Sequence, residues 1–213
     1  MLQKIHSEAI DVHTRLKELG LSIAALQEAV QQGYLSRAKL TQHHPRIFLG
    51  YSMWAETVAA LHDNLRPNDW SKVDDNNYEL TVNPDKTLAI AVTTGDESTG
   101  IAARHPSNKC PKGAHTIEVI ETNQQLDFFP DLFPPQEKNL LFTTWVLLIH
   151  VAEEEIRAEL SLPSEIVAGK IKAWKERIIL PPLPREDYAV LITPPDILPP
   201  DVPEIDVPIT RKA

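Results

Sequence analysis

The sequence predicts an α+β protein in which N-terminal helices pack on a mostly antiparallel sheet, followed by a proline-rich C-terminal tail. Apolar residues recur at helical spacing through the first 65 residues, and alternation typical of strands follows residue 78. Nine of the 18 prolines lie in residues 181–213. Hydrophobic residues at 42% and charged residues at 24% are globular values. We therefore predict one domain over residues 1–180, with an internal linker at 123–139 and an extended tail at 181–213.

The first predicted helix covers residues 2–19 and ends at Gly20, a residue suited to the left-handed position after a helix. Its apolar residues, three or four positions apart, form one stripe. They are Leu2, Ile5, Ala9, Val12, Leu16 and Leu19. This stripe could pack on the domain or on a second copy of the chain.

Two more helices are predicted before the sheet. Ser22 is a suitable N-cap for the second helix, which carries Ile23, Leu26 and Val30 and ends at Gly33. The third helix runs from Ser52 to Leu65 and is stopped by Pro67. Its apolar face holds Trp54, Val58, Leu61 and Leu65.

The first predicted strands, Tyr78–Val82 and Thr87–Thr93, flank the turn sequence Asn83-Pro84-Asp85-Lys86. In the second of them, large apolar residues alternate with alanines, which predicts a strand buried on both faces. Thr116–Thr122 is predicted as a third strand.

Residues Phe142–Val151 and Ile156–Leu162 are predicted to form a hairpin closed by Pro163. The alternative is one helix over 145–162, because Glu and Leu favour helices, but β-branched and aromatic residues cluster at its start. A short helix is predicted beyond it, on the spacing of Val167, Ile171, Trp174 and Ile178.

The bulk composition limits the partners and the compartment. A net charge of −9 argues against sequence-blind binding to duplex DNA, so direct nucleic-acid binding is predicted to be weak or absent. Cys110 is the only cysteine, which fits a reducing cytoplasm or a protein that needs no disulfide, and a cytoplasmic protein of bacterial or phage type is expected. The longest apolar run, 140–151, is too short to span a bilayer, so no membrane association is predicted.

One short segment suggests a specific partner. Its residues Gln125, Leu126, Asp127, Phe128 and Phe129 resemble the peptide by which many bacterial proteins dock on the replicative sliding clamp, with Phe128 where leucine is usual. An unstructured linker could present these aromatic anchors to an apolar pocket. The alternative is that the apolar residues of this segment fold back over the core.

A second candidate site is a basic loop. No acidic residue occurs between Ile101 and Ile117, and prolines and glycines surround the cations. The candidate anion-binding residues are Arg104, His105, Lys109, Lys112 and Gly113. They could hold a phosphate through lysines and backbone N–H groups. The alternative is a solvated hairpin loop whose cations pair with Asp96 and Glu97.

No cofactor, metal site or catalytic residue is predicted. The sequence lacks a Walker A loop, a dinucleotide fingerprint, a Gly-x-Ser-x-Gly turn and a Cys-x-x-Cys pair. His43-His44-Pro45 is interpreted as a turn. In the tail, Asp196, Asp201 and Asp206 recur every five residues among prolines, which favours polyproline II geometry. The tail could be solvated, or it could be a strap along a partner or its own domain.

Five stretches resemble an uncharacterised bacterial family found on integrative and conjugative mobile elements. They are Trp54-Ala55-Glu56-Thr57-Val58, Gly95-Asp96-Glu97-Ser98-Thr99-Gly100, Pro111-Lys112-Gly113, Glu159-Leu160-Ser161-Leu162-Pro163, and Trp174-Lys175-Glu176-Arg177-Ile178-Ile179-Leu180-Pro181. The resemblance spans roughly residues 20–181. It implies mobile-element biology and no particular activity.

The function that we predict is a non-enzymatic accessory protein of DNA metabolism or of a mobile genetic element, with a protein partner that residues 125–129 suggest is the sliding clamp. One alternative is an enzyme or sensor that binds a phosphorylated or nucleotide ligand at the 95–115 loop. Another is a structural subunit of a larger assembly. The sequence does not determine the oligomeric state.

Overall fold

The computed structural model describes residues 3–75, 78–113, 116–118, 120–123 and 142–185. Its strands are β1 (Lys4–His6), β2 (Ser71–Asp75), β3 (Tyr78–Val82), β4 (Leu88–Thr94), β5 (Thr143–Val151), β6 (Glu155–Val167), β7 (Lys170–Ile179) and β8 (Leu183–Pro184). Its longer helices are α1 (Ala9–Glu18), α2 (Ile23–Ala38) and α3 (Arg46–Leu65), and a 3₁₀ turn η1 (Arg66–Asn68) follows α3.

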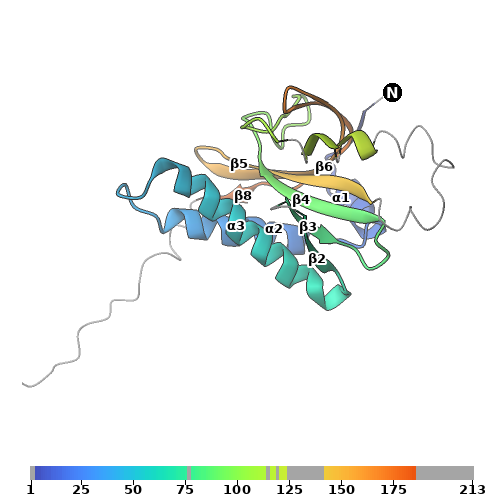
Figure 1. Cartoon of the computed structure of the whole chain (residues 1–213), viewed down its shortest axis with the longest axis horizontal. Helices are drawn as coiled ribbons and strands as arrows, with labels where there is room; N and C mark the ends of the chain where they lie inside the picture. Colours follow the sequence, from blue (N-terminus) through green and yellow to red (C-terminus); the bar gives the residue numbers. More distant parts are fainter. Residues whose placement is uncertain (1–2, 76–77, 114–115, 119, 124–141, 186–213) are drawn as a thin grey trace, which may run out of the picture.

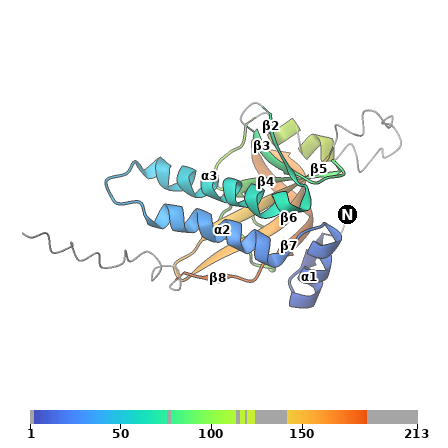
Figure 2. The ribbon, with the colours of Figure 1, turned by 90° about the horizontal axis from the view of Figure 1, so that it is seen from below.

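The described strands form one eight-stranded mixed sheet in the order β1-β7-β6-β5-β4-β3-β2, with β8 beside β6. Only the β1–β7 and β4–β5 pairs in this sheet are parallel. Helices α2 and α3 lie side by side along one face (Figure 2), and the described segments 100–113, 116–118 and 120–123 lie on the opposite face (Figure 1). The predicted α+β class, with helices in the N-terminal half and a mostly antiparallel sheet, is confirmed.

The first helix begins later than predicted. Residues Lys4–His6 form β1, which pairs with the edge of β7 and so satisfies backbone groups that would otherwise be unpaired. Helix α1 ends where predicted: Gly20 has φ +72°, and the N–H groups of Gly20 and Leu21 donate to Lys17 and Leu16 carbonyls. These two bonds form a Schellman motif.

Helix α2 starts at the predicted cap, where Ser22 Oγ accepts from the Ala25 N–H at 3.2 Å. It does not stop at Gly33 but continues to Ala38. A Cβ at Gly33 would overlap Thr57 Oγ1 and lie 2.6 Å from Met53 O. The glycine therefore allows α2 and α3 to approach closely, which a sequence pattern cannot distinguish from a helix stop.

Helix α3 begins at Arg46 rather than Ser52, so it is almost two turns longer than predicted. Pro45 occupies its N-cap position, where a missing N–H costs nothing. The helix ends at Leu65, and Pro67 lies in η1 as a stop, as predicted.

The predicted hairpin of β3 and β4 is confirmed. Its turn is fixed by Asn83, whose Oδ1 accepts from the N–H groups of Thr87 and Leu88, both at 2.9 Å. Strand β4 is buried on both faces, as predicted: Ile90 faces the helices and Ala89 faces the other side. The edge strand β2 was not predicted, because Val73 is its only apolar residue.

The hairpin of β5 and β6 is confirmed, and the alternative of one helix over 145–162 is wrong. Strand β6 does not stop at Pro163 but runs to Val167. The helix predicted on Val167, Ile171, Trp174 and Ile178 is also wrong: these residues lie in the β6–β7 hairpin.

A β-bulge explains this error. Glu176 pairs with Leu162 and Trp174 pairs with Pro163, so Lys175 is an extra residue in β7. This bulge places Trp174 and Ile178 on opposite faces of the sheet. A second register shift, at Lys172, leaves Ile171 and Trp174 three residues apart on one face, so the apolar spacing imitates that of a helix. The bulge at Lys175 also accommodates Pro163 inside β6.

The segment predicted as a strand at Thr116–Thr122 is helical over 116–118 and 120–123. Its β-branched residues favour a strand, but the segment covers the second face of the sheet. Ile120 is fully buried there with Val146, Leu148 and Trp174. The main core lies between the first face and the helices, and includes Leu16, Leu26, Leu61, Leu147 and Leu160.

Candidate functional site

The predicted clamp-docking residues, Gln125–Phe129, lie outside the described residues, as does most of the predicted linker. Their N-terminal flank is described. Asn123 Nδ2 donates to Thr144 O and Asn123 Oδ1 accepts from the Thr144 N–H, both at 2.9 Å and both buried. This pair of bonds holds the chain before residue 124 against the start of β5, where the chain returns at Phe142.

The predicted anion-binding residues lie on the loop that crosses the second face of the sheet. The side chains of Arg104, His105 and Lys109 are exposed, whereas Lys112 is half-buried and burial lowers its pKa. The backbone N–H groups of Arg104, Lys109 and Lys112 already donate to the carbonyls of Ile101, Thr94 and Gly169. These donors are not free to hold an anion, and binding by the side chains stays a prediction.

Asp96 and Glu97, the two acids expected to pair with these cations, do not form ion pairs with them among the described residues. The carboxylate of Asp96 accepts from the backbone N–H groups of Ser98 and Ser107, both at 3.0 Å, and so shapes the loop itself. Buried Asn108 then ties the loop to the β6–β7 turn, since its amide donates to Gly169 O at 2.8 Å.

A buried ion pair fixes the same loop over the sheet. Arg177 on β7 donates to both carboxylate oxygens of Glu159 on β6, at 2.6 and 3.0 Å, and both side chains are 0% exposed. The guanidinium also donates to the carbonyls of Ile101 and Arg104, and Glu159 accepts from the Gly100 N–H at 2.8 Å. Every charged group of this pair therefore has loop or strand partners, as burial of charge requires.

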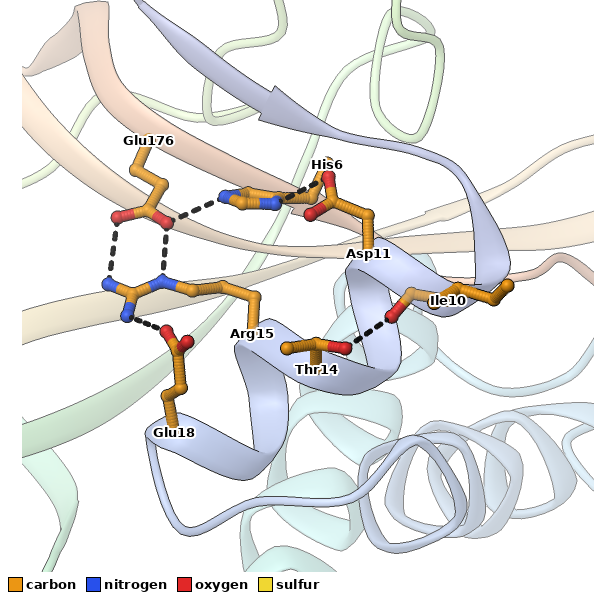
Figure 3. A network of polar contacts seen from close by, with 7 residues as sticks. All are labelled: His6, Ile10, Asp11, Thr14, Arg15, Glu18 and Glu176. Atoms are coloured by element: carbon orange, nitrogen blue, oxygen red, sulfur yellow. Dashed lines mark hydrogen bonds and ion pairs between the residues drawn. The ribbon is translucent and has the colours of Figure 1, made fainter.

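A second polar network joins α1 to the sheet (Figure 3). The buried ring of His6 lies between Asp11 and Glu176, at 2.7 Å from Nδ1 to Oδ2 and 2.8 Å from Nε2 to Oε1. Arg15 donates to both oxygens of Glu176, at 2.6 and 3.0 Å, and its Nη1 binds Glu18 at 2.7 Å. Both ring nitrogens of His6 and both carboxylate oxygens of Glu176 therefore have partners within the network.

This network has residue types that also occur in catalytic sites, but its geometry is that of a structural contact between the N-terminal segment and the sheet. His6 is 2% exposed and both of its ring nitrogens are engaged. Arg15 also lies over the ring of Trp145, with its Cζ 5.9 Å from the centroid. The residues come from β1, α1 and β7, so the network holds the N-terminal segment on the sheet.

We expect the contribution of this network to stability to decrease in acid. Burial alone would raise the pKa of Glu176, but hydrogen bonds and charge from Arg15, and then from His6, bring this pKa below its ordinary value of 4.5. A lowered folded-state pKa gives stability that is present above about pH 4.5 and lost as the pH falls through the folded-state value.

Glu176→Gln should therefore lower the free energy of unfolding by about 1.5 kcal/mol at pH 7 and have less effect near pH 3. Urea denaturation at both pH values checks this. The matched control is Glu18→Gln, which removes an exposed partner of Arg15 and should cost under about 0.5 kcal/mol. An equal loss for Glu176→Gln at both pH values would contradict the assignment.

A row of aromatic rings runs from His44, just before α3, along the first half of that helix. Successive ring centroids from His44 through Phe48 and Tyr51 to Trp54 are 6.0, 6.2 and 5.6 Å apart. Phe48 is 40% exposed, Tyr51 58% and the neighbouring Ile47 84%. Sequence reasoning assigned only Trp54 to a helix, because it placed the helix start at Ser52.

No family model, curated protein or solved structure matches this chain. Among the described helices, none has the length and apolar character that a membrane span requires. The described His, Cys, Asp and Glu residues include no group of three placed to hold a metal ion.

Proposed function

We propose that this protein is an accessory protein of DNA metabolism, carried by a mobile genetic element, that docks on the replicative sliding clamp through residues 125–129. The observation that carries the proposal is the peptide itself. Gln125, Leu126, Asp127 and Phe129 match four of the five positions of the clamp-docking pattern, and Phe128 supplies a second aromatic anchor. In this proposal Leu126 and the aromatic residues fill an apolar pocket, where a few buried anchors give most of the affinity.

The flanking geometry supports this function. The peptide begins two residues after Asn123, whose side chain is bound to Thr144 on β5. Asn123 and Phe142, the described residues on either side of the peptide-bearing segment, therefore both lie at the start of β5. In this proposal a partner engages a segment whose two ends are already fixed, which keeps the ordering cost of binding small.

The test is binding of the full-length chain to purified bacterial sliding clamp, measured by isothermal titration calorimetry. Leu126→Ala with Phe129→Ala should weaken binding by about 100-fold or more, because truncating an anchor costs about 2 kcal/mol or more. The thermal unfolding midpoint, measured in parallel, shows whether the double variant still folds.

The segment offers a matched control outside the docking pattern. Leu132→Ala with Phe133→Ala removes comparable apolar surface from the same segment and should leave the affinity within about threefold of wild type. Equal loss in both double variants would mean that the segment acts through general apolar contact. No binding of the wild-type chain to the clamp would reject the proposed function.

A further inference from the structure

The tip of the α2–α3 hairpin is a second surface that the proposed function does not use. The two helices extend past the edge of the sheet, so that their connection is far from the core (Figures 1 and 2). We call the aromatic row and its surroundings the hairpin-tip surface. It consists of Arg37, Lys39, His44, Arg46, Ile47, Phe48, Tyr51 and Trp54.

This surface combines exposed rings with positive charge. The chain has no acidic residue between Ala29 and Ala55, although its net charge is −9. Arg37, Lys39 and Arg46 form no ion pair with any described residue. A helix pair whose exposed aromatic side chains and cations lie in one acid-free stretch of the chain suits an acidic, partly apolar ligand.

The described part of the chain ends beside this surface. Arg185 Nε donates to the hydroxyl of Tyr34 on α2 at 3.1 Å, and its Nη1 donates to the carbonyls of Ala152 and Glu153. Strand β8, just before it, pairs with β6. The point from which residue 186 departs is therefore fixed one helical turn from Arg37, which lies on the same face of α2 as Tyr34.

The residues that follow have the complementary chemistry. Residues 186–210 contain six acids and no lysine or arginine. Their acids at 196, 201 and 206 are each followed by an aliphatic residue and soon by proline. Proline-rich segments in polyproline II geometry dock on rows of aromatic rings, because their extended form is already ordered.

We propose that the hairpin-tip surface is a binding site for an acidic, proline-rich peptide, and that residues 186–210 of the same chain are its ligand. The prolines pack on Phe48, Tyr51 and Trp54. The acids pair with the cations of the same hairpin, Arg37, Lys39 and Arg46. Residues 186–193 can span about 25 Å at about 3.1 Å per residue. Tyr34 and Lys39 are five residues apart, which corresponds to a helix rise of only about 8 Å. The linker is therefore long enough to reach from Tyr34 to the end of α2. Tethering favours this ligand over a free one, since a short linker gives an effective concentration in the millimolar range.

The test uses the full-length chain and a fluorescein-labelled synthetic peptide of residues 186–210, with fluorescence anisotropy as the readout. In a tail variant, Asp196→Ser with Asp201→Ser and Asp206→Ser, the chain's own tail should no longer occupy the hairpin-tip surface. The labelled peptide should then bind this variant about tenfold more tightly than wild type, as a tether near 1 mM predicts for an intrinsic Kd of about 0.1 mM. Equal affinity for the two proteins would overturn the proposal.

Further substitutions in the tail variant locate the site. Phe48→Ser with Tyr51→Ser should weaken peptide binding at least tenfold. Ile10→Ser, at an aliphatic residue on α1 that is 84% exposed and so more exposed than either ring, should leave it unchanged. The opposite pattern would overturn the assignment to the hairpin tip. Light scattering distinguishes the source of the ligand: a monomer at all concentrations supports the chain's own tail. A dimer that disappears in the tail variant would contradict this and would show that the ligand is the tail of a second copy. None of these measurements involves the clamp.

Discussion

Replacing Arg177 with methionine is expected to lower the free energy of unfolding by about 4 kcal/mol. The guanidinium and the Glu159 carboxylate are both 0% exposed, so the substitution leaves a buried carboxylate without its counter-charge. It also frees the carbonyls of Ile101 and Arg104 from their donor. Urea denaturation at pH 7 measures the loss, and amide hydrogen exchange of residues 98–107 should accelerate as the loop is released.

The control removes the charge of both partners. Arg177→Met with Glu159→Gln keeps an acceptor for the Gly100 N–H but leaves no unpaired ion in the interior. The double variant should recover about half of the stability that the single variant loses. A loss below about 1 kcal/mol in Arg177→Met, or a double variant less stable than the single one, would contradict a role for the pair in holding the loop.

Gly169→Ala is expected to lower the free energy of unfolding by about 3 kcal/mol, the second largest effect that we predict. Gly169 has φ +75° in the turn between β6 and β7, where an alanine is strained by about 1 kcal/mol. A Cβ would also lie 2.7 Å from Lys112 O and 2.8 Å from Lys112 N, and these backbone atoms cannot rotate away. Overpacking of this kind adds about 2 kcal/mol. Thermal and urea unfolding of the purified variant measure the cost.

The neighbouring residue supplies a control of opposite sign. Ala168 also has a positive φ, 51°, but carries a side chain that this conformation disfavours. Ala168→Gly should therefore leave stability unchanged or raise it by about 0.5 kcal/mol. A destabilisation by Ala168→Gly as large as that of Gly169→Ala would mean that the turn depends on side-chain packing and not on backbone conformation.

The elements that sequence predicted correctly are those with a local signal. Ser22 at a helix start, Gly20 after a helix end and Pro67 beyond Leu65 each act through the backbone of one turn. The β3–β4 hairpin likewise follows from a turn sequence between two alternating segments. In each case the physical cause lies within a few residues of its effect.

The errors have causes that are distant in the sequence. The bulge at Lys175 is fixed by the pairing of β7 with β6, and the helical residues 116–118 and 120–123 are favoured by the sheet face that they cover. Strand β1 exists because β7 offers it an edge. None of these partners can be identified from spacing in one chain.

The candidate sites divide in the same way. The clamp-docking peptide is contiguous, so its five residues could be named from the sequence alone, and their role stays a prediction. The hairpin-tip surface needed the true start of α3 at Arg46, which brings Ile47, Phe48 and Tyr51 into one helix with Trp54. The acid-free stretch from Ala29 to Ala55 was a sequence signal that could have indicated it.

The parallel pairing of β1 with β7 has a consequence for biosynthesis. Contacts such as that of His6 with Glu176 join residues 170 positions apart, so the start of the chain must wait for nearly the whole domain to be translated. At about 5–20 residues per second, the wait lasts roughly 9–34 s. During that time β7 does not yet exist, so residues 4–6 have no strand with which to pair. Chaperones can bind the unpaired segment in this interval.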